Sequence, residues 1–537
     1  MRRNFYKWLA GVLVVAQTLT AGAPDEKKVL ETMKQATRFM MEKAAYNGGF
    51  VWSYLPDFSR RWGEIEAKPT MIWMEDPGTP SVGHLLLDMY HATGDEYYYE
   101  SAKKVANALI WGQLDCGGWN YIVDFAGESS LKDWYATIGK AGWRLEEFHH
   151  YYGNATFDDN NTIGPATFLL RMYLEKYDPV YKPALDKAVG FVLESQYPNG
   201  GWPQRYPLRY DHVFQGQADY TSFITLNDAV TPNNVDFLLQ CYQAAGMRHL
   251  REPILRAMYL MIALQWGAPY AGWSDQYTPE DLNPAHARSY EPRGINTGTT
   301  TRMIYLMLDY YKLTGDNRFL ARIPEAIAFL ESQALPESEI KRFGRPFNGA
   351  GGNILVPRFI CPDTGKPQYV HRRGSNFHNG AYFYNQDIAN TIGHYSSAIT
   401  VNPSGLRKSY EATMALSPEV LRAKSPLFSA EPVPLEKYYT SIPRSNSGSL
   451  DGDVTALIRD INKEGFWLSP IEYSNPYKKY PKEGNAYSGN EYNATDVGDE
   501  YDTSAYHKDG VVGISTGVYI SNMMKCIIYL DSKRGSR

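Results

Sequence analysis

Four stretches of the chain repeat one pattern of apolar and polar positions. In each, apolar residues recur at three- and four-residue spacing in two consecutive runs, and a short polar break such as Thr93-Gly94-Asp95 separates the runs. Glycine favours the end of a helix and aspartate favours the start of the next one, so each stretch predicts a helical hairpin. The copies run from Ser81 to Gln113, Ile163 to Gln196 and Thr300 to Gln333, with a looser copy from Asn234 to Gln265.

Several of these hairpins close with a shared signature. Gln113 to Trp119 and Gln196 to Trp202 both read Gln-x-x-x-Gly-Gly-Trp, Gly272-Trp273 is a shorter version, and Asn47 to Phe50 resembles them. A single hairpin cannot bury both of its apolar faces, so the hairpins must stack on one another. The pattern predicts an all-α chain folded as an α/α toroid, a barrel of repeated helical hairpins. Long insertions separate the hairpins, and we expect them on one face, where loops carry function.

The two ends of the chain depart from this repeat. Residues 1–23 combine basic residues, an apolar run from Trp8 to Val15 and small residues, which is typical of a secretory signal peptide. We therefore expect a secreted or periplasmic protein. The apolar run is too short to span a bilayer and no later stretch is long enough, so no membrane span is expected.

The rest of the chain is expected to form a catalytic toroid and a packed extension. We assign residues 24–400 to the toroid and residues 401–537 to a C-terminal extension of helices and loops. Helical patterns return at Leu406 to Leu416, Asp453 to Glu464 and Gly513 to Leu530, and a tyrosine-rich stretch from Tyr473 to Tyr506 is expected to line the rim of a cleft and stack on sugars.

The net charge and the cysteine spacing argue against a nucleic-acid-binding protein and against a cysteine-based metal or redox site. The formal net charge is −5, so the overall balance does not favour nucleic acid, which selects basic surfaces. The four cysteines are too widely spaced for a metal or redox motif. Cys241 occupies an apolar helix position and is expected to be a buried thiol. A bridge between Cys116 and Cys361 stays open.

Three inserted loops concentrate polar residues. They run from Thr156 to Thr162, from Ile224 to Val230 and from Leu282 to Pro292. Taken singly, adjacent carboxylates at a helix start are ordinary caps, and a loop arginine is ordinarily a surface ion pair. In a toroid, however, the three loops converge at one mouth. Carboxylate and amide oxygens there suit calcium, and an arginine suits a negatively charged substrate.

These segments resemble polysaccharide lyase family 10, the pectate lyases of α/α-toroid fold. Ser195 to Leu208 resembles the family's hallmark, and Thr156 to Asp159, Ile224 to Asp228 and Ala287 to Glu291 resemble three further family segments in the same order. The resemblance covers about Leu109 to Ser332. It implies calcium-assisted β-elimination of polygalacturonate or a related uronan, an acidic polysaccharide. With the expected signal peptide, the sequence predicts a secreted lyase, and we expect it to be a monomer.

The resemblance also implies roles for individual residues. Arg288 matches the arginine that abstracts the C5 proton, and Asp158 and Asp228 match acidic residues of the calcium site. An arginine base requires that burial and a nearby cation lower a pKa that exceeds about 12 in water. The residues implied to contact the substrate are Asn227, Tyr290, Arg358, Arg373 and Trp202.

Other functions remain open at this point. Pro292 to Gly298 replaces an expected family loop, so another uronan or a methylated pectin is an alternative substrate. The Gln-x-x-x-Gly-x-Trp signature also resembles that of terpenoid cyclases, which need an Asp-rich acidic motif. Asp158-Asp159 is a weak candidate for that motif, and secretion fits a cyclase poorly. A toroidal glycoside hydrolase acting on uronic-acid glycans would use Asp158 and a second carboxylate, and a catalytically silent uronan-binding protein would show no turnover.

Overall fold

The computed structural model describes residues 24–141, 146–209, 218–373, 381–389, 391, 396–429, 431–439, 447–471 and 512–534. The expected signal peptide and the stretch from Tyr473 to Tyr506 lie outside these residues. No helix in the described part of the chain is both long and apolar enough to cross a membrane.

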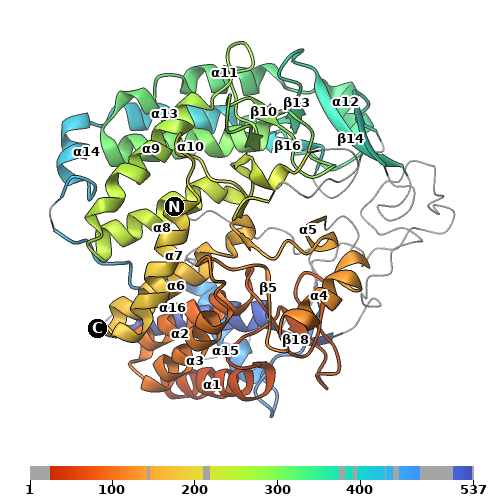
Figure 1. Cartoon of the computed structure of the whole chain (residues 1–537). Helices are drawn as coiled ribbons and strands as arrows, with labels where there is room; N and C mark the ends of the chain where they lie inside the picture. The colour runs from red at the N-terminus through yellow and green to blue at the C-terminus, as the bar shows by residue number, and fades with distance from the viewer. Residues whose placement is uncertain are drawn as a thin grey trace.

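Helical hairpins dominate the structure, as the sequence pattern predicts (Figure 1). The first helices of successive hairpins pack against one another, with α16 against α2, α2 against α6 and α6 against α8. The prediction of an all-α chain with α/α-toroid architecture is confirmed. The four repeated hairpins are α2 (Thr79–Thr93) with α3 (Glu96–Gly112), α6 (Ile163–Lys176) with α7 (Lys182–Glu194), α8 (Val230–Ala244) with α9 (Arg251–Ala263), and α10 (Thr297–Thr314) with α11 (Ile323–Ser332).

The polar breaks act as the sequence predicts. Gly94 ends α2 in the left-handed region with φ 71°, and the side chain of Asp95 accepts a hydrogen bond from the backbone N–H of Tyr97 at the start of α3. Gly315 and Asp316 do the same after α10, where Asp316 caps the short helix η8 (Asn317–Phe319). Each break therefore satisfies backbone groups that a helix end leaves open.

The ends of the chain add helices to the same stack. α1 (Glu26–Phe39), with its extension η1 (Met40–Ala44), packs against α15 (Ser447–Asp460) and α16 (Thr516–Arg534), while α13 (Pro403–Met414) and α14 (Pro418–Lys424) pack against α10. The three helical patterns expected in the C-terminal part are thus confirmed. The division at residue 400 stays a prediction. The remaining α-helices are α4 (Glu128–Ala136), α5 (Glu146–His149) and α12 (Glu337–Phe343).

Hydrogen bonds explain the repeated signature. The side-chain amide of Gln113 donates to Gly117 O at 2.8 Å and to Ala184 O on the next hairpin at 2.9 Å. Gln196 repeats the pair with Gly200 O and Pro253 O. Each glutamine therefore closes its own turn and ties it to the following hairpin.

The signature tryptophans are anchored in the same way. The indole N–H of Trp119 donates to Leu109 O at 2.8 Å, and that of Trp202 donates to Val192 O at 2.7 Å. Trp273 repeats the contact with Met261 O. Trp467, which the sequence pattern did not single out, donates to Leu457 O at 3.0 Å after α15. The repeat therefore extends to the C-terminal helices.

We expect Gly200→Ala to lower the free energy of unfolding by more than about 2 kcal/mol. Gly200 has φ 104°, and an added Cβ would lie 2.7 Å from Arg256 O, a backbone atom that cannot yield without moving a helix. Gly190→Ala, inside α7 with nothing within 4 Å of its added Cβ, is the matched control and should raise stability by up to about 1 kcal/mol. Urea denaturation measures the free energy of unfolding of both variants. Equal effects of the two substitutions would show that the conformation and close packing of Gly200 are not what makes it necessary.

The insertions form a layer of short antiparallel strands. β6 and β8 lie shortly before α6 and α8, and β11 leads directly into α10, so the layer sits at the amino ends of the first helices. The strands are β1 (Ser53–Tyr54), β2 (Arg61–Trp62), β3 (Glu66–Ala67), β4 (Met71–Trp73), β5 (Ile122–Asp124), β6 (Ala155–Thr156), β7 (Arg205–Tyr206), β8 (Ile224–Thr225), β9 (Gln276–Tyr277), β10 (Pro284–Ala285), β11 (Ile295–Asn296), β12 (Ile354–Pro357), β13 (Phe359–Ile360), β14 (Pro367–Arg373), β15 (Ala381–Asn385), β16 (Ala398–Val401), β17 (Ser469–Pro470) and β18 (Val512–Ser515).

These strands link one insertion to the next. The sheets run in the orders β17-β18-β1-β2-β3, β10-β9-β8 and β11-β13-β14-β15, and the pairs are β12 with β16, β4 with β5 and β6 with β7. Because β6 pairs with β7 and β8 with β9, each inserted loop is held against its neighbour at one mouth of the toroid.

All four cysteines are free thiols, so the bridge between Cys116 and Cys361 that the sequence left open does not form. Cys241 is buried, as predicted.

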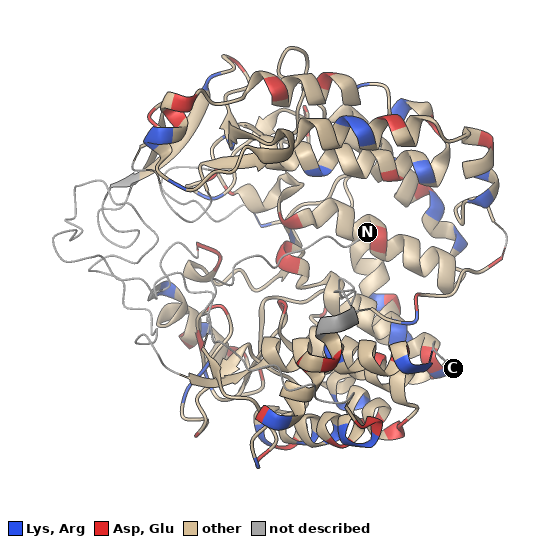
Figure 2. Cartoon of the chain, turned by 180° about the vertical axis from the view of Figure 1, so that it is seen from behind, with Lys and Arg blue, Asp and Glu red and all other residues tan. Residues whose placement is uncertain are grey.

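Seen from behind, residues of both charges are interspersed along the helices (Figure 2), in pairs such as Lys182 with Asp186 on α7.

Candidate active site

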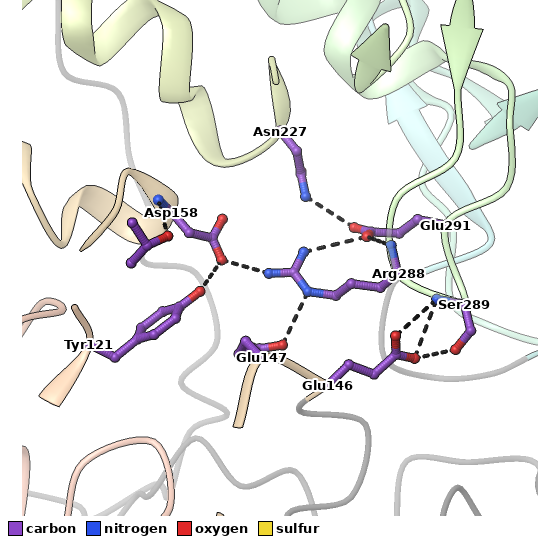
Figure 3. Close-up of polar contacts among 9 residues, drawn as sticks. Tyr121, Glu146, Glu147, Asp158, Asn227, Arg288, Ser289 and Glu291 are labelled. Atoms are coloured by element: carbon purple, nitrogen blue, oxygen red, sulfur yellow. Dashed lines mark hydrogen bonds and ion pairs between the residues drawn. The ribbon is translucent and has the colours of Figure 1, made fainter. Parts of the chain in front are cut away.

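Arg288 lies at the centre of the inserted layer, in the loop after β10, and its side chain is 3% exposed. Its Nη2 atom donates to Asp158 Oδ2 at 2.6 Å, its Nε atom to Glu147 Oε2 at 3.2 Å, and its Nη1 atom to Glu291 Oε2 at 3.4 Å (Figure 3). The guanidinium therefore faces three carboxylates, which fix its position from three sides.

Two acidic turns lie beside this arginine. Asp158 belongs to η3 (Asp158–Asn160) ahead of α6, and Asp228 belongs to η6 (Asn227–Ala229) ahead of α8. Asp159 and Asp228 both adopt left-handed backbone conformations, with φ 44° and 47°. A residue with a Cβ pays energy for this conformation, and such strain is frequent at functional sites.

The carboxylates of the two turns form one cluster. One oxygen atom each from Asp158, Asp159 and Asp228 lies within 4.8 Å of the others. Asp158 Oδ1 is buried and has no hydrogen-bond partner among the described residues. Three hard oxygen donors with an unsatisfied buried atom fit a divalent cation such as calcium, so the residues present suit the ion that the sequence predicts.

The pKa values of the cluster show how strongly its charges repel. Burial, then the negative charge of Asp158, raises the pKa of Asp228 well above its ordinary value. Burial, then the charge of Asp228, does the same for Asp159. Burial also acts to raise the pKa of Asp158, but Arg288 and the hydroxyl of Tyr121 outweigh it, and its pKa is lowered. A bound cation would relieve this repulsion.

The environment of Arg288 differs from the expected one. Burial tends to lower the pKa of its guanidinium, but the charges of Asp158 and Glu147 outweigh burial and the pKa lies well above its ordinary value. The expectation that burial and a nearby cation together lower this pKa stays a prediction, but burial alone does not lower it. The physical reason is the number of carboxylates that the fold places around one buried arginine.

Several site residues were missed by the sequence analysis. Glu146 and Glu147 come from the short helix α5, inside an insertion without a repeat partner, and the only local signal is two adjacent glutamates. Tyr121 follows the first signature, and its hydroxyl donates to Asp158 Oδ2. The hydroxyl of Ser289 donates to Glu146. No periodic pattern marks any of these residues.

The residues expected to contact substrate are distributed differently. Asn227 lies in the site, where its Nδ2 atom donates to Glu291 Oε1 at 3.0 Å. Tyr290 is buried and its ring meets that of Tyr382 edge to face. Trp202 is fully buried under its turn, so in this structure it packs the core and offers no surface to a ligand.

The two further arginines expected to contact substrate are Arg358 and Arg373. Arg358 follows β12, and its Nε atom donates to Ser396 O at 2.7 Å. The backbone of Arg373 ends β14 and pairs with Ala381, while its side chain is outside the described structure. Their substrate contacts stay predictions.

We expect the metal-free protein to lose stability as pH rises from about 4.5 to 8. Burial raises the pKa of Glu146 from 4.5 to about 8, although hydrogen bonds from Ser289 oppose the shift. A carboxyl whose folded-state pKa lies above its unfolded value stabilises the folded protein at low pH. This contribution to the free energy of unfolding, at most about 5 kcal/mol, is lost as pH rises from the unfolded pKa through the folded pKa. Glu146→Gln should flatten this dependence, whereas exposed Glu128→Gln should leave it unchanged. Urea denaturation across this pH range measures the free energy of unfolding. If that free energy depends on pH as strongly in Glu146→Gln as in the wild type, Glu146 is not the cause of the dependence.

Comparisons with known proteins agree with the sequence motifs. Residues 133–309 match the family model for pectic acid lyase. This segment contains η3, η6 and Arg288, and thus the candidate site except for Tyr121. No curated protein matches the chain.

Solved structures resemble the fold at a distance. One is a family 10 polysaccharide lyase from Cellvibrio cellulosa, with 16% identity over 62% of this chain and 98% of that chain and a TM-score of 0.37. Two others are a D-mannose isomerase (11% identity, 95% and 98% coverage, TM-score 0.39) and an unsaturated glucuronyl hydrolase specific for heparin (10% identity, 95% and 97% coverage, TM-score 0.37). At these TM-scores the structural similarities carry no conclusion about activity. On the family match and the motifs, residues 133–309 of the chain are similar to pectic acid lyase, as a divergent pectate lyase-like sequence would be.

Proposed function

We propose that the protein is a secreted or periplasmic polysaccharide lyase that cleaves polygalacturonate or a related uronan by calcium-assisted β-elimination. The observation that carries the proposal is the contact of Arg288 with Asp158, a member of a three-carboxylate cluster suited to a cation. The pectic acid lyase match supports an enzyme that acts on uronic-acid polysaccharides.

The chemistry requires that a weakly acidic C5 proton be removed. This proton becomes more acidic when the neighbouring sugar carboxylate is neutralised, which is what a calcium ion held by Asp158, Asp159 and Asp228 would supply. Arg288 in its neutral guanidine form takes the C5 proton and becomes a guanidinium cation. The electron pair of the former C5–H bond forms a C4–C5 double bond as the C4–O bond breaks. The departing oxygen keeps the electron pair of that bond and takes a proton from solvent water.

The contacts of Arg288 bear on how it acts as a base. Glu147 and Glu291 hold the guanidinium, and Nη2 points towards Asp158. Negative charge on Asp158 favours protonated Arg288, and this effect weakens when Asp158 shares its charge with a cation. Arg288 is therefore expected to act as a base only when the carboxylate cluster is neutralised.

A glycoside hydrolase is the second candidate, and one observation favours it. Glu146 has a pKa raised to about 8 by burial, while Asp158 has a lowered pKa. Two carboxyl groups with separated pKa values are the arrangement that glycosidases use as acid and base or nucleophile. In such an enzyme Glu146 would be the acid.

Ultraviolet absorbance separates these functions. Elimination leaves a conjugated double bond that absorbs, whereas hydrolysis produces reducing ends without absorbance. We expect absorbance to rise on polygalacturonate with added calcium and to stop when a chelator is added. Reducing ends without absorbance would replace the lyase with the hydrolase, and binding without either product would leave a uronan-binding protein. Export would be tested by sequencing the amino terminus of protein recovered outside the cytoplasm.

A further inference from the structure

A second buried arginine lies near the candidate site and is not used by the proposed mechanism. Arg205 belongs to β7, pairs in register with Thr156 of β6, and is 2% exposed. Its Nη1 atom donates to Asn120 Oδ1 at 3.2 Å and to Asn154 Oδ1 at 3.3 Å. Both acceptors are neutral amide oxygens, so they orient the guanidinium without balancing its charge.

Arg205 differs from other buried arginines of this chain in its counter-ions. Arg288 faces three carboxylates, and Arg171 pairs with Asp88 at 2.6 Å. Among the described residues, Arg205 makes no ion pair, and its buried Nη2 atom has no hydrogen-bond partner. The negative charge of Asp219 acts on the neighbouring Tyr152. Among the described residues, however, Asp219 and Arg205 form no ion pair. A buried charge without an ionic partner is costly, which suggests that a ligand supplies one.

Tyrosine rings connect Arg205 to the candidate reaction centre. The guanidinium carbon lies 4.5 Å from the ring centroid of Tyr152 and 5.3 Å from that of Tyr121. The hydroxyl of Tyr121 donates to Asp158, which in turn accepts from Arg288. Tyr121 therefore contacts Arg205 through its ring and the carboxylate cluster through its hydroxyl, so Arg205 lies beside the candidate reaction centre rather than in it.

We propose that Arg205 binds the carboxylate of a uronic-acid residue next to the sugar that reacts, and so selects acidic over esterified polymer. The inference rests on the proposed function and adds a subsite to it. The planar guanidinium offers N–H donors in a geometry that matches a carboxylate, and the Nη2 donors are not engaged by the described residues. A methyl ester lacks the negative charge that would balance the guanidinium.

Calorimetric binding of an oligogalacturonate and of its methyl ester to the full-length mature chain tests this subsite. We expect the wild type to bind the free acid about 10- to 100-fold more tightly than the ester. Arg205→Gln should make the two affinities similar, because it weakens binding of the free acid and leaves binding of the ester unchanged. Arg459→Gln, which removes an exposed charge on α15, should keep the preference. An unchanged acid preference in folded Arg205→Gln would overturn the proposal.

A second variant keeps the test decisive if Arg205→Gln does not fold. Asn120→Asp places a carboxylate at an oxygen that already accepts from Arg205, and the hydroxyl of Tyr135, which now accepts from the Asn120 amide, can donate instead. This internal counter-ion should reduce the acid preference by about 10-fold or more while the guanidinium remains. A folded Asn120→Asp protein with the full wild-type preference would also overturn the subsite.

Absorbance measured in parallel separates failure of the subsite from failure of the lyase. An acid preference that depends on Arg205, without any rise in absorbance, would refute elimination and keep the subsite. A rise in absorbance together with an acid preference that ignores Arg205→Gln would refute the subsite and keep the lyase.

Discussion

Arg288→Lys is expected to lower kcat/KM for the rise in absorbance on polygalacturonate by at least about 10³-fold. Lysine keeps the positive charge, but it lacks the planar fork that contacts Asp158, Glu147 and Glu291 together. A proton acceptor displaced from its position loses most of its effect on the rate, because proton transfer depends on hydrogen-bond geometry.

Arg171→Lys is the matched control for this variant. Arg171 forms a buried ion pair with Asp88 between α6 and α2, away from the acidic turns, so its substitution disturbs packing without touching the proposed chemistry. Rates are compared per folded protein, with thermal unfolding recorded for both variants. Near wild-type kcat/KM in Arg288→Lys would remove Arg288 from the role of base.

Asp228→Asn is expected to stabilise the metal-free protein at neutral pH and to abolish its stabilisation by calcium. The raised pKa of Asp228 means that ionising this carboxyl costs folding free energy above its unfolded pKa, since burial and Asp158 oppose the charge. In the wild type, calcium at 100 times its dissociation constant should add about 2.7 kcal/mol to the free energy of unfolding. Elimination by the variant should fall at least about 10²-fold.

Urea denaturation with calcium and with a chelator measures these effects without relying on activity. The control is Asp186→Asn on α7, an exposed partner of Lys182, which should change stability by less than about 1 kcal/mol and keep the calcium response. An Asp228→Asn protein that calcium stabilises as much as the wild type would refute the assignment of Asp228 to the cation site.

The hairpin fold could be predicted because its signals are local. Breaks such as Gly94-Asp95 specify where one helix ends and the next begins, through a left-handed glycine and a side-chain cap. The spacing of apolar residues then fixes which faces must be buried. The repeated glutamine and glycine signature indicated stacking, although its hydrogen bonds to the next hairpin became visible only in the folded chain.

The candidate site could be predicted only in part. Asp158, Asp228 and Arg288 stand in motifs before or after repeated helices, and the resemblance to pectate lyases singles them out. Glu147 and Tyr121 lie in insertions without periodicity, and they reach Arg288 and Asp158 through contacts between segments distant in the chain. The resemblance implied a substrate contact for Trp202, but its side chain is fully buried and its indole N–H donates to Val192 O.

The sequence by itself determined the helical hairpins, their stacking and the three polar loops, since caps, periodicity and repeats act between residues close in the chain. Only the tertiary structure decided which carboxylates surround Arg288, and therefore that its pKa rises in the metal-free site. It also left Arg205 buried between tyrosines without a carboxylate partner among the described residues. Charge interactions depend on distance and burial in space, and neither can be read from positions along the chain.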